Sequence, residues 1–370
     1  MGNRLPLTGL RQPLQAAGLC GLALQAVLCW AGPADAVPTA TAPALPAVLN
    51  QPALVTPKAL RAGMLALARA GTRLVAVGER GTVLLSDDGG QQWRQASVPV
   101  QTTLTGVRFA DAEHGWAVGH LGVVLHTDDG GQRWVKQLDG VQAAALALQA
   151  ASASGDGAAR RSAEQLVQDG PDKPFFDVEC LDAQRAIVVG AFGLAYITGD
   201  GGKTWQPAQQ RMDARRSVHL YAVRRVGEQL YIAGEQGLLM RSADQGASFQ
   251  TVPTPYKGSF FGLLASPSGA VLAYGLRGNA YRSADQGVSW EKVETGVTVG
   301  LSAGLARSDA SLALVSQNGD VLASRDDGRH FTRHGTWPMP AAGLAEAGDG
   351  AQAHLVLAGL RGLQVLPAKP

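Results

Sequence analysis

Apolar segments separated by glycine recur along the chain after residue 60 and set its pattern of hydrophobic and polar positions. The recurring unit is an apolar run, a Gly-x-x-Gly step and a second apolar run, as in VAVGERGTVLLS (75–86) and WAVGHLGVVLHT (116–127). Short apolar runs bounded by Gly are typical of strands, so each unit predicts a β-hairpin preceded by one further strand, such as LTGVRFAD (104–111). The other five hairpins lie at 188–198, 231–242, 272–283, 313–324 (with Ser for the first Gly) and 355–366.

An eight-residue motif, Ser/Thr-x-Asp-x-Gly-x-x-Trp/Phe, follows each of the first six hairpins. In such a motif the Asp carboxylate accepts backbone N–H bonds across a turn, the Gly permits a positive φ, and the aromatic residue packs between neighbouring units. We therefore interpret the motif as structural, with metal or ligand binding as the alternative. Its aspartates are Asp88, Asp129, Asp200, Asp244, Asp285 and Asp326, at successive spacings of 41, 71, 44, 41 and 41 residues.

These elements predict an all-β fold, a seven-bladed β-propeller with four-stranded antiparallel blades, over residues 47–370. The 47 glycines agree with many tight turns. The seventh unit, from Ala342 to Leu366, has only three strands and no Asp motif. We expect the segment Ala47–Thr56 to supply its outer strand, so that an N-terminal strand closes the ring and removes an exposed edge. Six or eight blades are the alternatives if an end unit is misread.

The 71-residue spacing indicates an insertion between blades two and three, at 138–174. Its core is rich in Ala, Leu and Gln, with Ser-Gly-Asp-Gly in the middle, which predicts two short helices and a hinge. A tolerated surface insertion and a functional loop are both open interpretations.

The first 36 residues have the features of a secretory signal peptide. Arg4 and Arg11 precede an apolar stretch from Leu14 to Trp30, and Ala34-Asp35-Ala36 offers a small-x-small cleavage site. Residues 37–46 then read as a flexible linker, and we expect a periplasmic mature protein. A retained membrane anchor is the alternative. Cleavage leaves Cys180 as the single cysteine, which predicts a monomer without disulfide-linked oligomers.

Charge and composition exclude several classes of function. Cleavage removes two Arg and one Asp, leaving a formal net charge of +1, so no nucleic-acid partner is expected. The seven histidines lack metal-ligand spacing, which predicts no metal site. The segment GERGTV lies in a hairpin and not between a strand and a helix, so no phosphate loop and no cofactor are expected.

Chain order places the Gly-x-x-Gly turns and the blade-to-blade connections on one face of the propeller, opposite the Asp motifs. The connection Gln206–Ser217 is rich in arginine, with Arg224 and Arg225 just beyond it. This predicts a basic patch for an acidic protein surface or an anionic group, and a solvated face is the alternative. The candidate partner-binding residues are Glu79, Arg80, His120, Phe192, Glu235, Arg277 and Arg361 in the turns, and Arg211, Arg215 and Arg216 in the connection.

The six motifs resemble the Asp-box (BNR-type) repeat of propeller proteins. The segments GVRFADAEHGWAVGHLGVVLHTDDGGQRW (106–134) and FFDVECLDAQRAIVVGAFGLAYITGDGGKTW (175–205) are similar to the photosystem II stability/assembly factor family, in its non-photosynthetic bacterial branch. That resemblance implies an exported, non-catalytic propeller that binds or assists assembly of a membrane-protein complex, such as an RND-type exporter. It also implies partner docking through an Arg-rich patch, with a membrane protein or its periplasmic domain as the partner.

A glycan-binding or sialidase-like glycoside hydrolase propeller is the alternative function, because Asp-boxes also occur in sialidases. Arg80, Arg277 and Arg361 are candidates for an arginine triad, and Glu79 and Glu235 for paired carboxylates. The sequence lacks the Arg-Ile-Pro motif that sialidases share, so we expect a protein that is not an enzyme.

Overall fold

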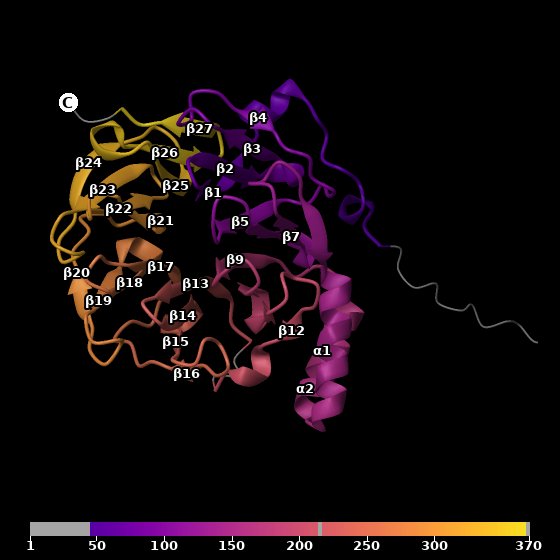
Figure 1. The fold of residues 1–370 in the computed structure, drawn as a ribbon. Coiled ribbons are helices and arrows are strands. Elements are labelled where there is room, and N and C mark those ends of the chain that lie inside the picture. Colours follow the sequence, from indigo (N-terminus) through magenta and orange to yellow (C-terminus); the bar gives the residue numbers. More distant parts are fainter. Residues whose placement is uncertain (1–44, 214–216, 368–370) are drawn as a thin grey trace, which may run out of the picture. The chain divides into compact units, whose positions relative to one another are not determined.

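The computed structural model describes residues 45–213 and 217–367. Most of the residues assigned to the signal peptide and linker, together with Arg215 and Arg216, lie outside this range, so those predictions are not addressed by the fold. The described chain forms seven antiparallel sheets that follow one another in sequence and surround a central axis (Figure 1). The predicted seven-bladed β-propeller is therefore confirmed.

Each blade runs outward in chain order, from an inner strand beside the axis to an outer strand. The first three blades contain β1 (Met64–Ala70), β2 (Arg73–Gly78), β3 (Val83–Ser86) and β4 (Arg94–Gln95); β5 (Leu104–Phe109), β6 (Gly115–Gly119), β7 (Val124–Thr127) and β8 (Val135–Leu138); and β9 (Phe175–Cys180), β10 (Ala186–Gly190), β11 (Ala195–Thr198) and β12 (Gln206–Pro207).

The remaining four blades continue in the same order. They contain β13 (Leu220–Val226), β14 (Gln229–Gly234), β15 (Leu239–Ser242) and β16 (Gln250–Thr251); β17 (Phe260–Ala265), β18 (Val271–Gly275), β19 (Ala280–Ser283) and β20 (Glu291–Val293); β21 (Leu301–Ala306), β22 (Leu312–Ser316), β23 (Asp320–Ser324) and β24 (Thr332–Thr336); and β25 (Ala341–Ala347), β26 (His354–Gly359) and β27 (Gly362–Val365).

All seven inner strands share one irregularity. The pairing register of each shifts between its first and third residues, so the second residue is bulged. The inner strands of neighbouring blades contact one another, and β25 contacts β1 to complete the ring. The bulge therefore gives every blade an equivalent residue at one end of the central channel.

The predicted ring closure by an N-terminal strand is wrong. Blade seven has three strands, and the segment 47–56 lies along the chain that connects blades one and two. There the Gln101 N–H donates to Val48 O (2.8 Å) and the Ala53 N–H donates to Val98 O (2.9 Å). Pro46 and Pro52 flank or interrupt this segment, and proline cannot donate to a strand ladder.

The ring is closed instead by packing between blades seven and one. The Asp-box turn of blade one lies on blade seven, where a Cβ at Gly90 would be 3.2 Å from the side chains of Val356 and Val365. A ring nitrogen of His354 (Nε2) lies 2.8 Å from Gly89 O in the same turn. Blade one thus already presents its own turn to blade seven, and no exchanged strand is needed.

Each Asp-box turn is held by the same set of hydrogen bonds. In blade five the Ser283 hydroxyl donates to Asp285 and accepts the Gly287 N–H, and Asp285 also accepts the Ser289 N–H (2.9 Å). The equivalent hydroxyl–carboxylate and hydroxyl–glycine bonds occur in the other five turns. Hydrogen bonds led by that from the Ser289 hydroxyl lower the pKa of Asp285 to about 2. The carboxylate therefore stabilises the turn in its ionised form.

We predict that acid weakens the fold through these turns. Because the pKa of Asp285 is lower in the folded protein than its ordinary value of 3.8, its stabilising effect is complete above about pH 4 and is lost as the pH falls toward 2. Urea denaturation at a series of pH values should show wild type more stable than Asp285→Asn at pH 6, with the gap narrowing between pH 4 and pH 2. A gap that is constant with pH would contradict this role.

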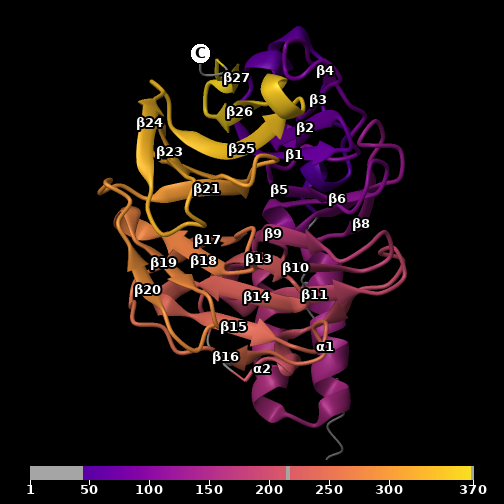
Figure 2. The same ribbon diagram turned by 60° about the vertical axis from the view of Figure 1, so that its left-hand side comes forward.

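The insertion forms two helices, α1 (Gly140–Ser154) and α2 (Gly157–Asp169), as predicted, and they lie side by side against blade three (Figure 2). Asp139 caps α1, with a reciprocal bond from the Asp139 N–H to the Gln142 side chain. The Tyr196 hydroxyl of β11 donates to Ala143 O (2.6 Å), which joins α1 to the propeller. No helix within the described ranges is long and apolar enough to cross a membrane.

The backbone of Gly140, the first residue of α1, lies very close to the turn after β6. A Cβ at Gly122, in the turn after β6, would lie 2.6 Å from Cα of Gly140. Gly155, between the two helices, has a similar φ (+71° against +66°) but no atom within 4 Å of a Cβ.

We predict that Gly122→Ala destabilises the protein more than Gly155→Ala. Both variants incur the cost of a left-handed alanine, about 1 kcal/mol, but only Gly122→Ala also forces the backbone of α1 away. Thermal unfolding of the two variants should show the larger loss for Gly122→Ala. Equal losses would mean that this approach contributes nothing.

Candidate functional site

The Gly-x-x-Gly turns and the blade-to-blade connections lie at the same end of every blade, as the antiparallel strand order requires. We call this end the hairpin face and the opposite end the Asp-box face. The second glycine of the turn lies directly on the next connection. A Cβ at Gly81 would be 2.1 Å from Val100 O, and one at Gly278 would be 2.0 Å from Val297 O. Turn and connection therefore form one continuous surface on the hairpin face.

Five of these turns hold a residue other than glycine in the left-handed region, just before the second glycine. The φ angles there are 53° at Arg80, 56° at Leu121, 53° at Phe192, 56° at Gln236 and 57° at Arg277. Such a conformation costs about 1 kcal/mol for a residue with a side chain. The shared geometry fixes where these side chains begin on the hairpin face.

The predicted turn residues lie on the hairpin face, but they do not all gather in one place. Glu79, Arg80, His120, Arg277 and Arg361 are exposed, on blades one, two, five and seven. Within the described ranges, none of the three arginines forms an ion pair or a side-chain hydrogen bond. They therefore supply separate positive charges around the face.

Two arginines that the sequence places in a basic patch have other partners. The Arg211 guanidinium donates to Gly246 O (3.3 Å), in the Asp-box of blade four, and to the Gln206 side chain (3.0 Å). Arg224 faces the central channel. Neither belongs to an exposed patch on the hairpin face, because strand register and the neighbouring turn, and not sequence proximity, decide where each side chain points.

A continuous group of aromatic side chains lies where the hairpin face meets the channel. The bulged second residues of three consecutive inner strands are Phe176, Tyr221 and Phe261, with ring centroids 5.3 and 5.4 Å apart. His219 contacts Phe176 (5.7 Å) and Tyr221 (5.9 Å), and the exposed Phe192 packs on His219 (4.8 Å). We call these five residues the aromatic wall.

The wall occupies only one side of the channel mouth. At the equivalent bulged position, the other four inner strands carry Leu65, Thr105, Ser302 and Ala342. Aromatic residues therefore face smaller side chains across the mouth.

Polar bonds fix the wall in place. Glu235 accepts the His219 N–H (2.9 Å) and the Tyr221 hydroxyl (3.3 Å), and the Phe192 N–H donates to a ring nitrogen of His219 (3.1 Å). Burial, assisted by the charge of Glu235, raises the pKa of Tyr221 to about 12. The Tyr221 hydroxyl therefore remains a donor. Two predicted residues, Phe192 and Glu235, are thus brought together, and Lys173 of the insertion lies 5.6 Å from the Phe192 ring.

The central channel contains a charge cluster within a cavity of about 150 Å³. Arg224 lies 2.5 Å from a carboxylate oxygen of Asp177 and 3.8 Å from one of Glu179. Arg108 faces the same space, and burial and the charge of Arg224 lower the pKa of Arg108. Burial raises the pKa of Glu179. The channel therefore has a polar lining in blades two to four.

We predict that Arg224→Met lowers the free energy of unfolding by about 3 kcal/mol, because it removes the ion-pair partner of the buried Asp177. Arg69→Met is a matched control, since Arg69 pairs with the exposed Asp349 (3.5 Å) and such pairs contribute about 1 kcal/mol or less. Urea denaturation of both variants measures the difference. Similar small losses in both would show that the channel pair is well solvated.

Four residues of the wall, Phe176, His219, Tyr221 and Phe261, were not among the predicted site residues. An alignment of the seven inner strands by repeat would have found three of them, because aromatic residues fill the same position in three consecutive units. His219, outside that position, gives no such signal.

The predicted catalytic carboxylates do not form a pair in the described residues. No group of three or more His, Cys, Asp or Glu side chains in residues 45–213 and 217–367 could hold a metal ion. Glu79 and Glu235 belong to turns of blades one and four, as far apart as a ring of seven blades allows. They do not provide the close pair of carboxylates that glycosidases use.

The fold and the hairpin face define the class of protein: a seven-bladed β-propeller with an ordered aromatic surface at one end of its channel. The family model of the photosynthesis system II assembly factor YCF48 matches residues 89–159 and 157–334. The chain belongs to that family, which confirms the resemblance found in the sequence.

Similar solved structures agree with the fold. One described as YCF48 bound to D1 peptide has a TM-score of 0.60 at 18% identity, covering 84% of this chain and 94% of that one. YCF48 from Cyanidioschyzon merolae gives 0.57 at 14%, covering 82% and 95%. The GH74 xyloglucanase from Xanthomonas campestris gives 0.56 at 14%, covering 85% and 53%. At these identities the structures establish the fold alone, and no curated protein matches the sequence.

Proposed function

We propose that this protein is an exported, non-catalytic propeller that binds a membrane protein, or its periplasmic domain, and assists assembly of the partner's complex. The aromatic wall on the hairpin face is the observation that carries the proposal. Membership of an assembly-factor family supports it, as does the structure of a YCF48 protein with a bound peptide. Export rests on the signal-peptide features of residues 1–36.

The wall has the chemistry of an interface hot spot. Aromatic side chains contribute much of the binding energy in protein interfaces, particularly where they are held rigid before the partner arrives. Phe192 is 54% exposed, and its backbone N–H is fixed by His219. The partner therefore contributes an apolar segment to this site.

The exposed turn arginines Arg80, Arg277 and Arg361 indicate the charge of the partner. Arg80, Arg277 and Arg361 stand on other blades of the same face and attract acidic groups over a longer range. Such rim charges mainly increase the rate of association, while the wall determines how long the complex lasts. We infer a partner with an apolar anchor surrounded by acidic residues.

We predict that the hairpin face, and not the Asp-box face, contacts the partner. A photoreactive phenylalanine analogue placed at Phe192 should cross-link to one membrane protein in the organism of origin. The matched control places it at Lys203, which is exposed in the Asp-box of the same blade. Cross-links of equal yield at both positions, or none at Phe192, would refute the proposed face, and recovery of the protein only from the cytoplasm would refute export.

One observation favours the alternative of a glycoside hydrolase. Tyr221 and Glu235 form a hydroxyl–carboxylate pair at the channel mouth, and sialidases use a Tyr–Glu pair as nucleophile. The raised pKa of Tyr221 disfavours its nucleophilic form. Turnover of a fluorogenic sialoside that is lost in Glu235→Gln would establish the hydrolase and overturn the non-catalytic proposal.

A further inference from the structure

Six of the seven interfaces between neighbouring blades contain an aromatic residue from an Asp-box. The Asp-box aromatic of each blade packs in the apolar cluster that joins that blade to the preceding one. These residues are Trp93 (between blades seven and one), Trp134, Trp205, Phe249, Trp290 and Phe331, in ring order. No Asp-box follows β27 within the described residues, and the cluster between blades six and seven contains no such aromatic residue.

The Asp-box turns also receive a side-chain hydrogen bond from the preceding blade. In blade five, for example, the Gln286 carbonyl accepts a bond from Arg241 of blade four (2.9 Å). The equivalent bonds join Arg73 to Gly130, Gln137 to Gly201, Arg282 to Asp327 and His354 to Gly89, while Arg211 binds Gly246 in blade four. Each turn thus covers the preceding blade with both an aromatic ring and a hydrogen-bond acceptor.

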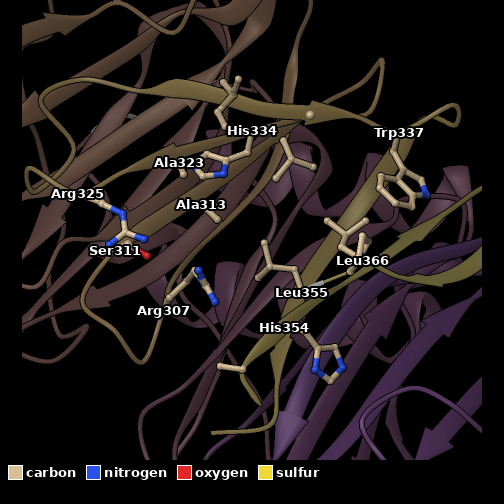
Figure 3. A pocket seen from close by; sticks show the side chains of 15 residues that line it. Arg307, Ser311, Ala313, Ala323, Arg325, His334, Trp337, His354, Leu355 and Leu366 are labelled. Atoms are coloured by element: carbon tan, nitrogen blue, oxygen red, sulfur yellow. The ribbon is translucent and has the colours of Figure 1, made fainter. Parts of the chain in front are cut away.

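The interface between blades six and seven has an open cavity where this cover would lie (Figure 3). Its volume is about 240 Å³. Blade six contributes Ala313 and Ala323, and blade seven contributes Leu355 and Leu366. Trp337 also lines it, and the indole N–H of Trp337 finds no acceptor among the described residues. The cavity is apolar and large enough for a side chain.

A strand edge lies beside the cavity. β27 pairs with β26 on one side only, and no strand in the described ranges pairs with its other side. In the other six blades a fourth strand occupies the equivalent edge. Within residues 45–213 and 217–367, blade seven therefore has neither the outer strand nor the Asp-box aromatic residue of its neighbours, and unpaired strand edges are templates for added strands.

Basic side chains stand at the rim of the cavity. Arg307, Arg325, His334 and His354 are among the residues that line it, and no carboxylate is. Arg307 is paired with Glu346 (2.8 Å) and Asp309 (3.6 Å), whereas Arg325 is exposed and forms no salt bridge or side-chain hydrogen bond with a described residue. The exposed Arg325 favours an occupant with an acidic group.

We propose that this interface is a docking site for an extended, acidic segment of a partner protein, which adds as a strand to β27 and places an aromatic side chain in the cavity. The molecule's own repeat defines that chemistry, because an acidic turn, an aromatic residue and a strand occupy this place in every other blade. Added strands of this kind combine main-chain bonds with side-chain pockets. The site is separate from the hairpin-face contact proposed above.

The N-terminal segment of the described residues does not fill this site. The described N-terminal segment is occupied elsewhere, since Lys136 of blade two donates to Leu49 O (3.0 Å) and to Asn50 (2.9 Å). That segment is therefore not the occupant of the site.

Binding of a peptide copied from blade five tests the proposal. The probe is fluorescein-labelled SADQGVSWEKV, the sequence of residues 283–293, added to the purified mature protein. Fluorescence anisotropy should show saturable binding, at least tenfold weaker for the same peptide with Ala at the Trp290 position. Hydrogen exchange should slow in β27 when the peptide is bound.

Two variants locate the site. Ala323→Trp fills the cavity and should abolish binding, and Arg325→Glu should weaken it about tenfold. Arg329→Glu, an exposed charge in the same Asp-box that does not line the cavity, is the control and should bind as wild type does. Because Arg325 is exposed, its variant remains informative even if Ala323→Trp fails to fold.

Several results would overturn the proposal. Absence of saturation at millimolar peptide, equal binding of the Trp290→Ala peptide, or binding unaffected by Arg325→Glu would each do so. A dimer of the protein alone that becomes monomeric in Arg325→Glu would identify a second copy as the occupant instead. Cross-linking at Phe192 is independent of all these results, so failure here leaves the hairpin-face proposal intact.

Discussion

The contact of each Asp-box turn with the preceding blade holds this propeller together. Each turn is stabilised by its own carboxylate and inserts an aromatic ring between its own sheet and that of the preceding blade. In blade five, the turn also accepts a hydrogen bond from a side chain of the preceding blade. Because the contact repeats around the ring, it fixes how neighbouring blades pack. Cys180, the single cysteine of residues 45–213 and 217–367, is buried as a small apolar side chain. The motif residues of the Asp-box turns are therefore required for folding, whereas most residues of the turns on the hairpin face are not.

That division explains where the functional features lie. The aromatic wall and the turn arginines Arg80, Arg277 and Arg361 lie on the hairpin face, where only the glycines of each turn are required by the backbone. The bulge in every inner strand adds one variable position per blade at the channel mouth. The insertion is placed on the same end of blade two and contributes Lys173 beside the wall. A partner that approaches this face meets side chains from several blades at once.

The repeats predicted the fold well because they are local. Strand, turn and Asp-box are each encoded within about 41 residues, so blade number, chain order, the helical insertion and the shared face followed from the sequence alone. The predicted pairing of residues 47–56 with blade seven was wrong, because other parts of the chain compete with a distant segment for the same contacts. Blade one already packs on blade seven through Gly90, and the prolines of the N-terminal segment exclude it from a ladder.

The site could be predicted only in part. Phe192 and Glu235 were found because turn residues are visible in the repeat, whereas their partners His219 and Tyr221 come close only through the curvature of the ring. The place of Arg224 was not predicted, because consecutive residues of a strand point to opposite sides. Arg224 therefore enters the channel, which a count of charges along the chain does not reveal.

The contact between His354 and Gly89 has a consequence for how the protein is made. These residues are 265 positions apart, and their contact joins the first and last blades. Every other blade has its predecessor available as soon as it emerges, but the turn of blade one waits for almost the whole chain. Distant contacts of this kind form late, because the intervening chain must first be ordered. Blade one therefore spends much of synthesis with one flank uncovered, and completion of the ring is the event that ends its exposure to proteases and to other unfolded chains.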